Sequence, residues 1–150
     1  MNKTDARERA ALLLFESDSK NQTVDATLAE LDVAPDKYVV ALLEDYSRLS
    51  DRIATLLSDS TKGWASDRLP GFDRAVLRMA ITELVRSADT PVGTVISEAV
   101  KLCETYSTPE SPRFVNGVLG TIAHNVRGVD LIRSQEQNNE HSQDVPETDV

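Results

Sequence analysis

Apolar side chains recur every three or four residues along one segment near the middle of the chain, and this repeat restricts the fold more than any other feature. The repeat follows Pro35 for about six helical turns. Its members are Val39, Leu42, Leu43, Tyr46, Leu49, Ile53, Leu56 and Leu57. Such spacing puts the apolar side chains on one face of an α-helix, whereas a half-buried strand needs strict alternation. The segment therefore predicts a long amphipathic helix packed against other helices.

Shorter segments with the same spacing predict further helices on both sides of this one. We expect helices over residues 4–17, 24–31 and 112–127, one that begins with Asp73 as its N-cap, and one whose buried stripe runs from Val95 to Tyr106. Aromatic residues make up only 5% of the chain and glycine and proline are sparse, which argues against a sandwich or barrel. The sequence thus predicts an all-α fold.

The dipeptide Asn116-Gly117 lies inside the last predicted helix, although Asn-Gly between apolar runs normally indicates a hairpin turn. The neighbouring apolar residues keep helical spacing, and Ser111-Pro112 supplies an N-cap followed by a proline at the first helical position. A glycine inside a helix costs about 1 kcal/mol relative to alanine. We therefore expect Gly117 to allow close approach of another backbone or of a ligand.

Composition limits where the chain works and what it binds. No apolar run approaches the roughly 20 residues that cross a bilayer, and the first ten residues are too charged for a secretory signal. We expect a soluble, cytoplasmic protein without a membrane partner. A single cysteine rules out a disulfide framework and a zinc site built on paired cysteines. The net charge of −9 argues against indiscriminate nucleic-acid binding.

The last residues differ in composition from the rest of the chain. Residues 134–150 contain five acidic residues, no lysine or arginine, and few apolar side chains. Such a segment cannot bury enough apolar surface to offset the entropy lost on ordering. We predict a disordered acidic tail over residues 134–150 after a folded domain over residues 1–133.

Three blocks of residues follow one another in a fixed order. They are Ala6-Arg7-Glu8-Arg9-Ala10 with Leu14-Phe15, Asp73-Arg74-Ala75-Val76-Leu77-Arg78 with Glu83-Leu84, and Glu98-Ala99-Val100 leading to Phe114-Val115-Asn116-Gly117-Val118-Leu119. Together they resemble the NusB family of bacterial transcription antitermination factors, over about residues 4 to 127. The resemblance implies two small packed helical bundles, about six to seven helices in all, without catalytic activity or a cofactor.

The resemblance also implies two partners. One is the BoxA-type single-stranded RNA of ribosomal RNA operons, and the other is NusE, a small-subunit ribosomal protein. The resemblance implies that the protein, bound to both in an antitermination complex, helps RNA polymerase read through terminators. The residues implied to bind RNA are Lys3, Arg7, Phe15, Glu110, Arg113, Phe114 and Asn116. The residues implied to bind NusE are Asp73, Arg74 and Arg78.

The residues themselves support an RNA surface at the start of the last helix. An aromatic ring beside a cation at a helix N-terminus can stack a base and hold a phosphate near the positive end of the helix dipole. Structural alternatives remain open for each residue. The rings of Phe15 and Phe114 can pack in the core, Glu110 can complement the helix dipole, and the cations can be solvated. Asp73 can act as a helix cap without binding a partner.

One departure from the family favours a second hypothesis. Members often carry a run of arginines before the first block, where this chain has Lys3, Thr4 and Asp5. Each missing cation removes about one released counterion from RNA binding. The alternative is a protein-only interaction module that binds NusE or self-associates as a homo-oligomer, with weak or lost RNA binding.

Enzymatic chemistry finds little support in the sequence. A nucleophile needs a base within hydrogen-bond reach, and the only histidines are His124 and His141, of which the second lies in the predicted tail. Cys103 falls on a predicted buried stripe, where a thiol behaves as a small hydrophobe. There is no glycine-rich phosphate loop and no metal-ligand spacing. We expect neither catalysis nor a metal site.

Overall fold

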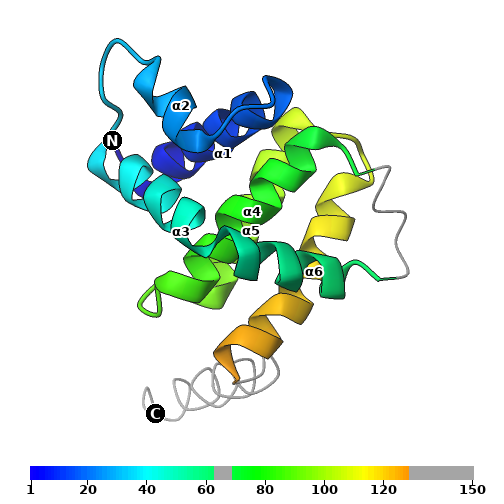
Figure 1. Cartoon of the computed structure of the whole chain (residues 1–150). Helices are drawn as coiled ribbons and strands as arrows, with labels where there is room; N and C mark the ends of the chain where they lie inside the picture. Colours follow the sequence, from blue (N-terminus) through cyan, green and yellow to red (C-terminus); the bar gives the residue numbers. More distant parts are fainter. Residues whose placement is uncertain (63–68, 129–150) are drawn as a thin grey trace, which may run out of the picture.

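The computed structural model describes residues 1–62 and 69–128, and every regular element in these ranges is an α-helix (Figure 1). The helices are α1 (Lys3–Ser19), α2 (Val24–Ala29), α3 (Lys37–Ser60), α4 (Gly71–Arg86), α5 (Val92–Tyr106) and α6 (Ser111–Arg127). The all-α prediction is confirmed. The predicted tail at residues 134–150 lies outside the described residues.

Helix α4 forms the centre of the molecule. It contacts α1 and α3 on one side and α5 and α6 on the other, so it belongs to both groups of helices (Figure 1). Eleven of its sixteen residues are buried, which is the pattern of a helix surrounded by others rather than one with a single inner face. The two bundles therefore share one hydrophobic core that runs through α4.

The long periodic segment forms α3, as its spacing predicts. The helix begins at Lys37 rather than Pro35, because the carboxylate of Asp36 accepts a hydrogen bond from the backbone N–H of Tyr38 at 2.9 Å and caps it. Val39, Leu42 and Ile53 are fully buried. The last apolar residues of the stripe are only partly buried against the core, so burial weakens toward the end of α3.

Two predicted N-caps are wrong. Asp73 is the third residue of α4, which begins at Gly71 after Pro70, and Ser111 is the first residue of α6 rather than its cap. The physical reason is that these two side chains bind each other: the Ser111 hydroxyl donates to the Asp73 carboxylate at 2.6 Å. Neither α4 nor α6 has a side-chain hydrogen bond at its N-cap.

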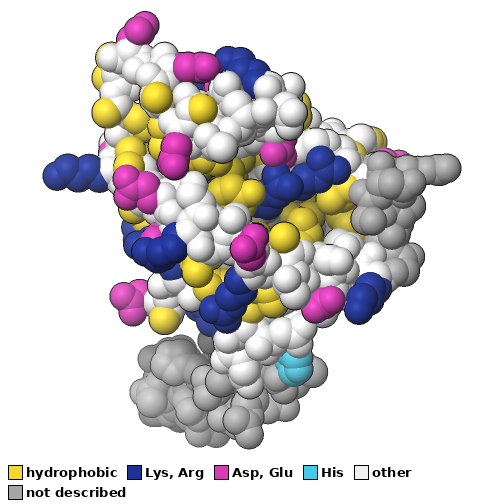
Figure 2. All heavy atoms as spheres, in the orientation of Figure 1, with side chains coloured by type: hydrophobic (Ala, Val, Ile, Leu, Met, Phe, Trp, Pro, Cys, Tyr) yellow, Lys and Arg dark blue, Asp and Glu magenta, His cyan; other side chains and the backbone are white. Residues whose placement is uncertain are grey.

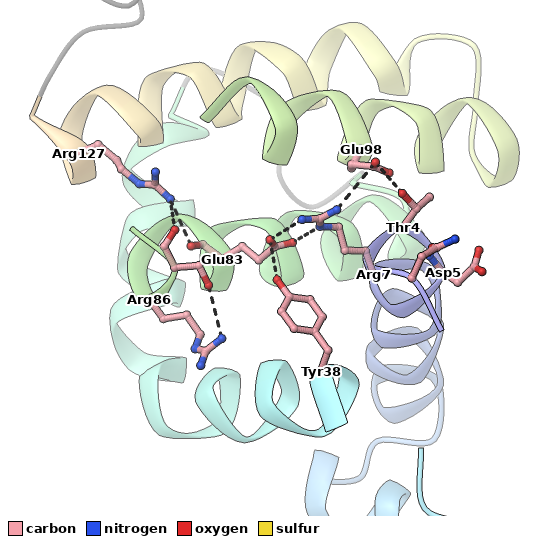
Figure 3. Close-up of polar contacts among 10 residues, drawn as sticks. Thr4, Asp5, Arg7, Tyr38, Glu83, Arg86, Glu98 and Arg127 are labelled. Carbon is pink, nitrogen blue, oxygen red and sulfur yellow. Dashed lines mark hydrogen bonds and ion pairs between the residues drawn. The ribbon is translucent and has the colours of Figure 1, made fainter. Parts of the chain in front are cut away.

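Arg127, the last residue of α6, closes the C-terminal end of α4 (Figure 3). Its guanidinium donates to the backbone carbonyls of Leu84 at 3.0 Å, Ser87 at 2.9 Å and Thr90 at 2.7 Å. The last carbonyls of a helix lack partners within the helix, and a cation there also complements the helix dipole. Arg127 thus fixes the end of α6 to the end of α4.

The surface carries charges of both signs. On the face shown in Figure 2, Lys and Arg side chains are interspersed with Asp and Glu and do not form one continuous basic patch. Across the described ranges, no helix combines the length and the apolar character needed to span a bilayer.

Candidate nucleic-acid and protein interfaces

The start of α6 presents several of the predicted RNA-binding side chains. Arg113 and Asn116 are exposed, Glu110 is exposed just before the helix, and Phe114 is half-buried with part of its ring against the core. Phe114 thus packs partly against the core, and its role in RNA binding stays a prediction. The residues form a corner where a ring, a guanidinium and an amide lie within two helical turns.

The space around Gly117 decides one part of its predicted role. Among residues 1–62 and 69–128, nothing lies within 4 Å of a Cβ atom added at Gly117, and the residue is exposed. The prediction that Gly117 allows close approach of another backbone is therefore wrong for the described part of the chain. Close approach of a ligand from outside stays a prediction.

Arg7 lies inside the protein, and its predicted role as an RNA contact is wrong (Figure 3). Arg7 is 3% exposed, and its Nε and Nη2 donate to the Glu83 carboxylate at 2.5 and 3.0 Å. Glu83 is completely buried and also accepts from the Tyr38 hydroxyl at 3.0 Å. Because α1 packs against α4, this side chain faces α4 rather than solvent.

The charges in this pair set the local acid–base behaviour. Burial alone would lower the pKa of Arg7, but the hydrogen bond and charge of Glu83 outweigh it, so the pKa is raised. Burial and then the Glu83 carboxylate raise the pKa of Tyr38. Arg7 is therefore a structural cation that holds α1 to α4, and its Nη1 faces the Glu98 carboxylate at 3.8 Å.

Lys3 stays at the surface one turn before Arg7. It is exposed, and its Nζ lies 5.4 Å from the centre of the Tyr38 ring, within reach of a cation–π contact. Phe15, further along α1, is twelve residues away, or about 18 Å at 1.5 Å per residue. The predicted RNA residues on α1 therefore do not form one compact site.

Phe15 belongs to an aromatic cluster with Phe72 and Tyr106. Phe15 is 38% exposed, and its ring meets the edge of Phe72 at 6.0 Å between centres. Phe72 lies 5.1 Å from Tyr106, whose hydroxyl donates to Glu8 at 2.6 Å. Tyr106 is 45% exposed, so its predicted place on the buried stripe of α5 is wrong. The cluster exposes two rings between α1, the start of α4 and the end of α5.

The predicted protein-binding residues on α4 divide into surface and interior. Arg74 is half-buried, and the side chain of Arg78 is 27% exposed while its Nη1 lies 2.7 Å from both carboxylate oxygens of Asp18. Asp73 is 1% exposed. In this conformation Asp73 offers no surface to a partner.

Two contacts of Asp73 could not be found from the sequence. Its carboxylate accepts from Ser107 and Ser111, which are 34 and 38 residues away. These bonds join the start of α6 to the start of α4, next to Phe72 and thus to the aromatic cluster. The cluster and the corner at Arg113 and Phe114 consequently lie at the same end of the molecule.

Catalytic chemistry has no support among the described residues. Burial, followed by the charge and hydrogen bond of Asp73, raises the pKa of Cys103 to about 12, so its thiol stays protonated and unreactive. Within residues 1–62 and 69–128, no group of three or more His, Cys, Asp or Glu could hold a metal ion.

Comparison with known proteins shows the family of this chain. A sequence model of the NusB family matches residues 4–124. The chain belongs to the NusB family. It is 43% identical to the transcription antitermination protein NusB of Saccharopolyspora erythraea over 124 residues, covering 79% of this chain and 84% of the relative. It is 40% identical to the protein of the same name from Nocardioides sp., covering 80% and 92%.

Solved structures of NusB proteins share the fold. T. maritima NusB superposes with a TM-score of 0.73 at 29% identity, covering 82% of this chain and 91% of that one. A crystal structure of NusB and NusE in complex with dsRNA superposes with a TM-score of 0.69 at 24% identity, covering 82% and 96%. The NusB-like fold is confirmed, and family membership confirms a non-enzymatic antitermination factor.

Proposed function

We propose that this chain binds BoxA-type single-stranded RNA together with NusE and so helps RNA polymerase read through terminators in ribosomal RNA operons, in the cytoplasm. The observation that carries the proposal is the corner at the start of α6, where the half-buried ring of Phe114 lies within one helical turn of the exposed Arg113 and Asn116. A ring and a cation at a helix N-terminus suit a stacked base and its phosphate. The relatives are named as antitermination proteins, and one structure of this fold contains NusE and RNA.

The proposed RNA surface comprises Lys3, Glu110, Arg113, Phe114 and Asn116, with Arg7 removed from it. The exposed Glu110 would accept hydrogen bonds from base amino groups. Only two of these side chains carry positive charge, so RNA binding by this chain alone should be weak and only mildly salt-dependent. A slope of about −1.4 in log affinity against log salt follows from two phosphate contacts on a single strand.

The proposed NusE surface comprises Arg74 and Arg78 on α4. The neighbouring ring of Phe15 lies against the first turn of the same helix, because its Cε2 is 3.1 Å from the position a Cβ would take on Gly71. An exposed ring beside a cation is the composition of residues that dominate protein interfaces. We therefore move Phe15 from the RNA surface to the protein surface.

A fluorescence-anisotropy titration of labelled BoxA RNA, with and without NusE, tests the proposal. Phe114→Ala and Arg113→Ala should each weaken RNA binding and leave NusE binding intact. Arg52→Ala removes an exposed cation of α3 and should change neither. Failure of the wild-type chain to bind RNA at low salt, even with NusE, would refute the RNA-binding part of the proposed function.

The second candidate is a protein-only module that binds NusE or a second copy of itself. The burial of Arg7 favours it, since the chain loses one more cation from the RNA surface. Under this function Phe114→Ala would have no effect on any binding, whereas Arg78→Ala would weaken NusE binding.

A further inference from the structure

A buried carboxylate gathers hydroxyl groups at the junction of α4, α5 and α6. The Oδ1 and Oδ2 atoms of Asp73 each accept a hydrogen bond at 2.6 Å, from Ser107 and Ser111 respectively. The two serine hydroxyls are 2.9 Å apart, and the Thr108 hydroxyl lies 2.8 Å from that of Ser111. We call Asp73, Ser107 and Ser111 the hydroxyl clamp.

The clamp holds both ends of the connection between α5 and α6. Ser107 follows the last residue of α5, and Ser111 is the first residue of α6. Between them, residues 108–110 are exposed. Both ends of this short connection are therefore fixed to the first turn of α4, and the connection has little freedom to change the direction in which α6 begins.

The direction of α6 determines where the proposed RNA-binding side chains point. Glu110 precedes Ser111, and Arg113 and Phe114 follow it by two and three residues. All three lie within one helical turn of the clamp. A change in the position of Ser111 would move the ring and the guanidinium together.

The carboxylate of Asp73 is committed to this arrangement. Asp73 is 1% exposed and Ser111 2% exposed, and both carboxylate oxygens already accept short hydrogen bonds. Burying a carboxylate is costly unless hydrogen bonds or a favourable dipole compensate for lost water. Its place in the first turn of α4 supplies the helix dipole as well. A partner could reach this group only by opening the junction.

We propose that Asp73 is a positioning residue for the RNA surface, acting through Ser107 and Ser111, and not a contact for the protein partner. This inference rests on the proposed function and deepens it. It separates two roles along one helix: the third residue of α4 orients the RNA corner, while Arg74 and Arg78 face the protein partner.

The test compares two affinities in the same variants. Ser111→Ala, the double variant Ser107→Ala/Ser111→Ala, and Asp73→Asn each weaken the clamp. Thr105→Ala is the matched control, because its exposed hydroxyl bonds to the Lys101 carbonyl of its own helix and takes no part in the clamp. Dissociation constants are measured separately for BoxA RNA and for NusE, and thermal unfolding is followed to confirm that each variant is folded.

The expected result is a split between the two affinities. RNA affinity should fall about tenfold, the scale of one lost hydrogen bond to a charged group. NusE affinity should stay within about twofold of wild type, because its surface is untouched. The salt dependence of RNA binding should keep the wild-type slope in the clamp variants, whereas Arg113→Ala should flatten it by about 0.7. Amide hydrogen exchange should accelerate at residues 111–116 but not in α3.

Several results would overturn the inference. One is that Asp73→Asn weakens NusE binding as much as RNA binding, or more. Another is that folded clamp variants bind RNA as tightly as Thr105→Ala does. Failure of the proposed function looks different, because the wild-type chain itself would then bind no RNA at low salt. That result would remove the role of the corner along with the RNA surface.

Discussion

Replacing Arg7 with methionine tests the interpretation of the buried ion pair most directly. The change keeps the length and apolar stem of the side chain but removes both hydrogen bonds to Glu83, at 2.5 and 3.0 Å. Glu83 is 0% exposed, so its charge would remain buried with only the Tyr38 hydroxyl as a donor among the contacts described above. Breaking a buried pair by removing one partner costs about 3–5 kcal/mol.

Urea unfolding followed by circular dichroism measures this cost. For a domain of this size, each kcal/mol of lost unfolding free energy lowers the melting temperature by roughly 2–4 °C. In thermal unfolding the variant should therefore melt about 10 °C lower than wild type. Arg9→Met removes an exposed cation of the same helix and should leave stability within about 0.5 kcal/mol of wild type. Replacing both partners, as Arg7→Met/Glu83→Leu, should recover much of the loss because no charge is left unpaired.

The reasoning fails if the free energy of unfolding of Arg7→Met lies within about 1 kcal/mol of the wild-type value, because a loss of roughly 3–5 kcal/mol is expected. It fails equally if the variant is stable but loses RNA affinity with a flatter salt dependence, as Arg113→Ala should. Either result would return Arg7 to the RNA surface.

Three further changes test other features. Gly117→Ala fills open space in an exposed helix and should stabilise the fold by about 1 kcal/mol in urea unfolding; a loss of stability would mean that the chain needs this glycine. Arg127→Met leaves the carbonyls of Leu84 and Thr90 without the guanidinium donor, while Ser87 keeps the Thr90 N–H, and should cost about 2–3 kcal/mol in the same assay. An unchanged stability would mean that water replaces the guanidinium. The pKa of Cys103, about 12 in the fold against 9.0 for a free thiol, means that the folded state holds its proton longer. The stabilisation that the protonated thiol gives to the folded state is complete below pH 9. It is lost as pH rises toward 12, by at most about 4 kcal/mol. Cys103→Ala should therefore flatten the fall in stability above pH 9, and an unchanged pH profile would contradict this.

The helices were predictable because their signals are local. Apolar spacing, together with Pro35 and Ser111-Pro112 as start signals, located α1, α3 and α6 within a few residues. The three sequence blocks then indicated the family and its fold, which comparison confirms.

The charged residues that were misassigned, Arg7 and Asp73, make contacts between distant parts of the chain. Arg7 meets Glu83 across 76 residues, and Asp73 meets Ser107 and Ser111 across 34 and 38. A charged residue on a helix looks the same in the sequence whether it faces water or a buried partner. Asp73 was predicted as a cap because its residue type suits one, and only the packing of α6 on α4 reveals where its oxygens point.

The central position of α4 has a consequence for how the molecule folds and unfolds. Because both groups of helices use this one segment as their inner wall, neither group can bury its apolar surface without it. A severed half would expose an apolar face to water and lose the driving force that orders it. The two groups should accordingly unfold in a single cooperative transition, and a destabilising substitution in either group should lower the stability of both.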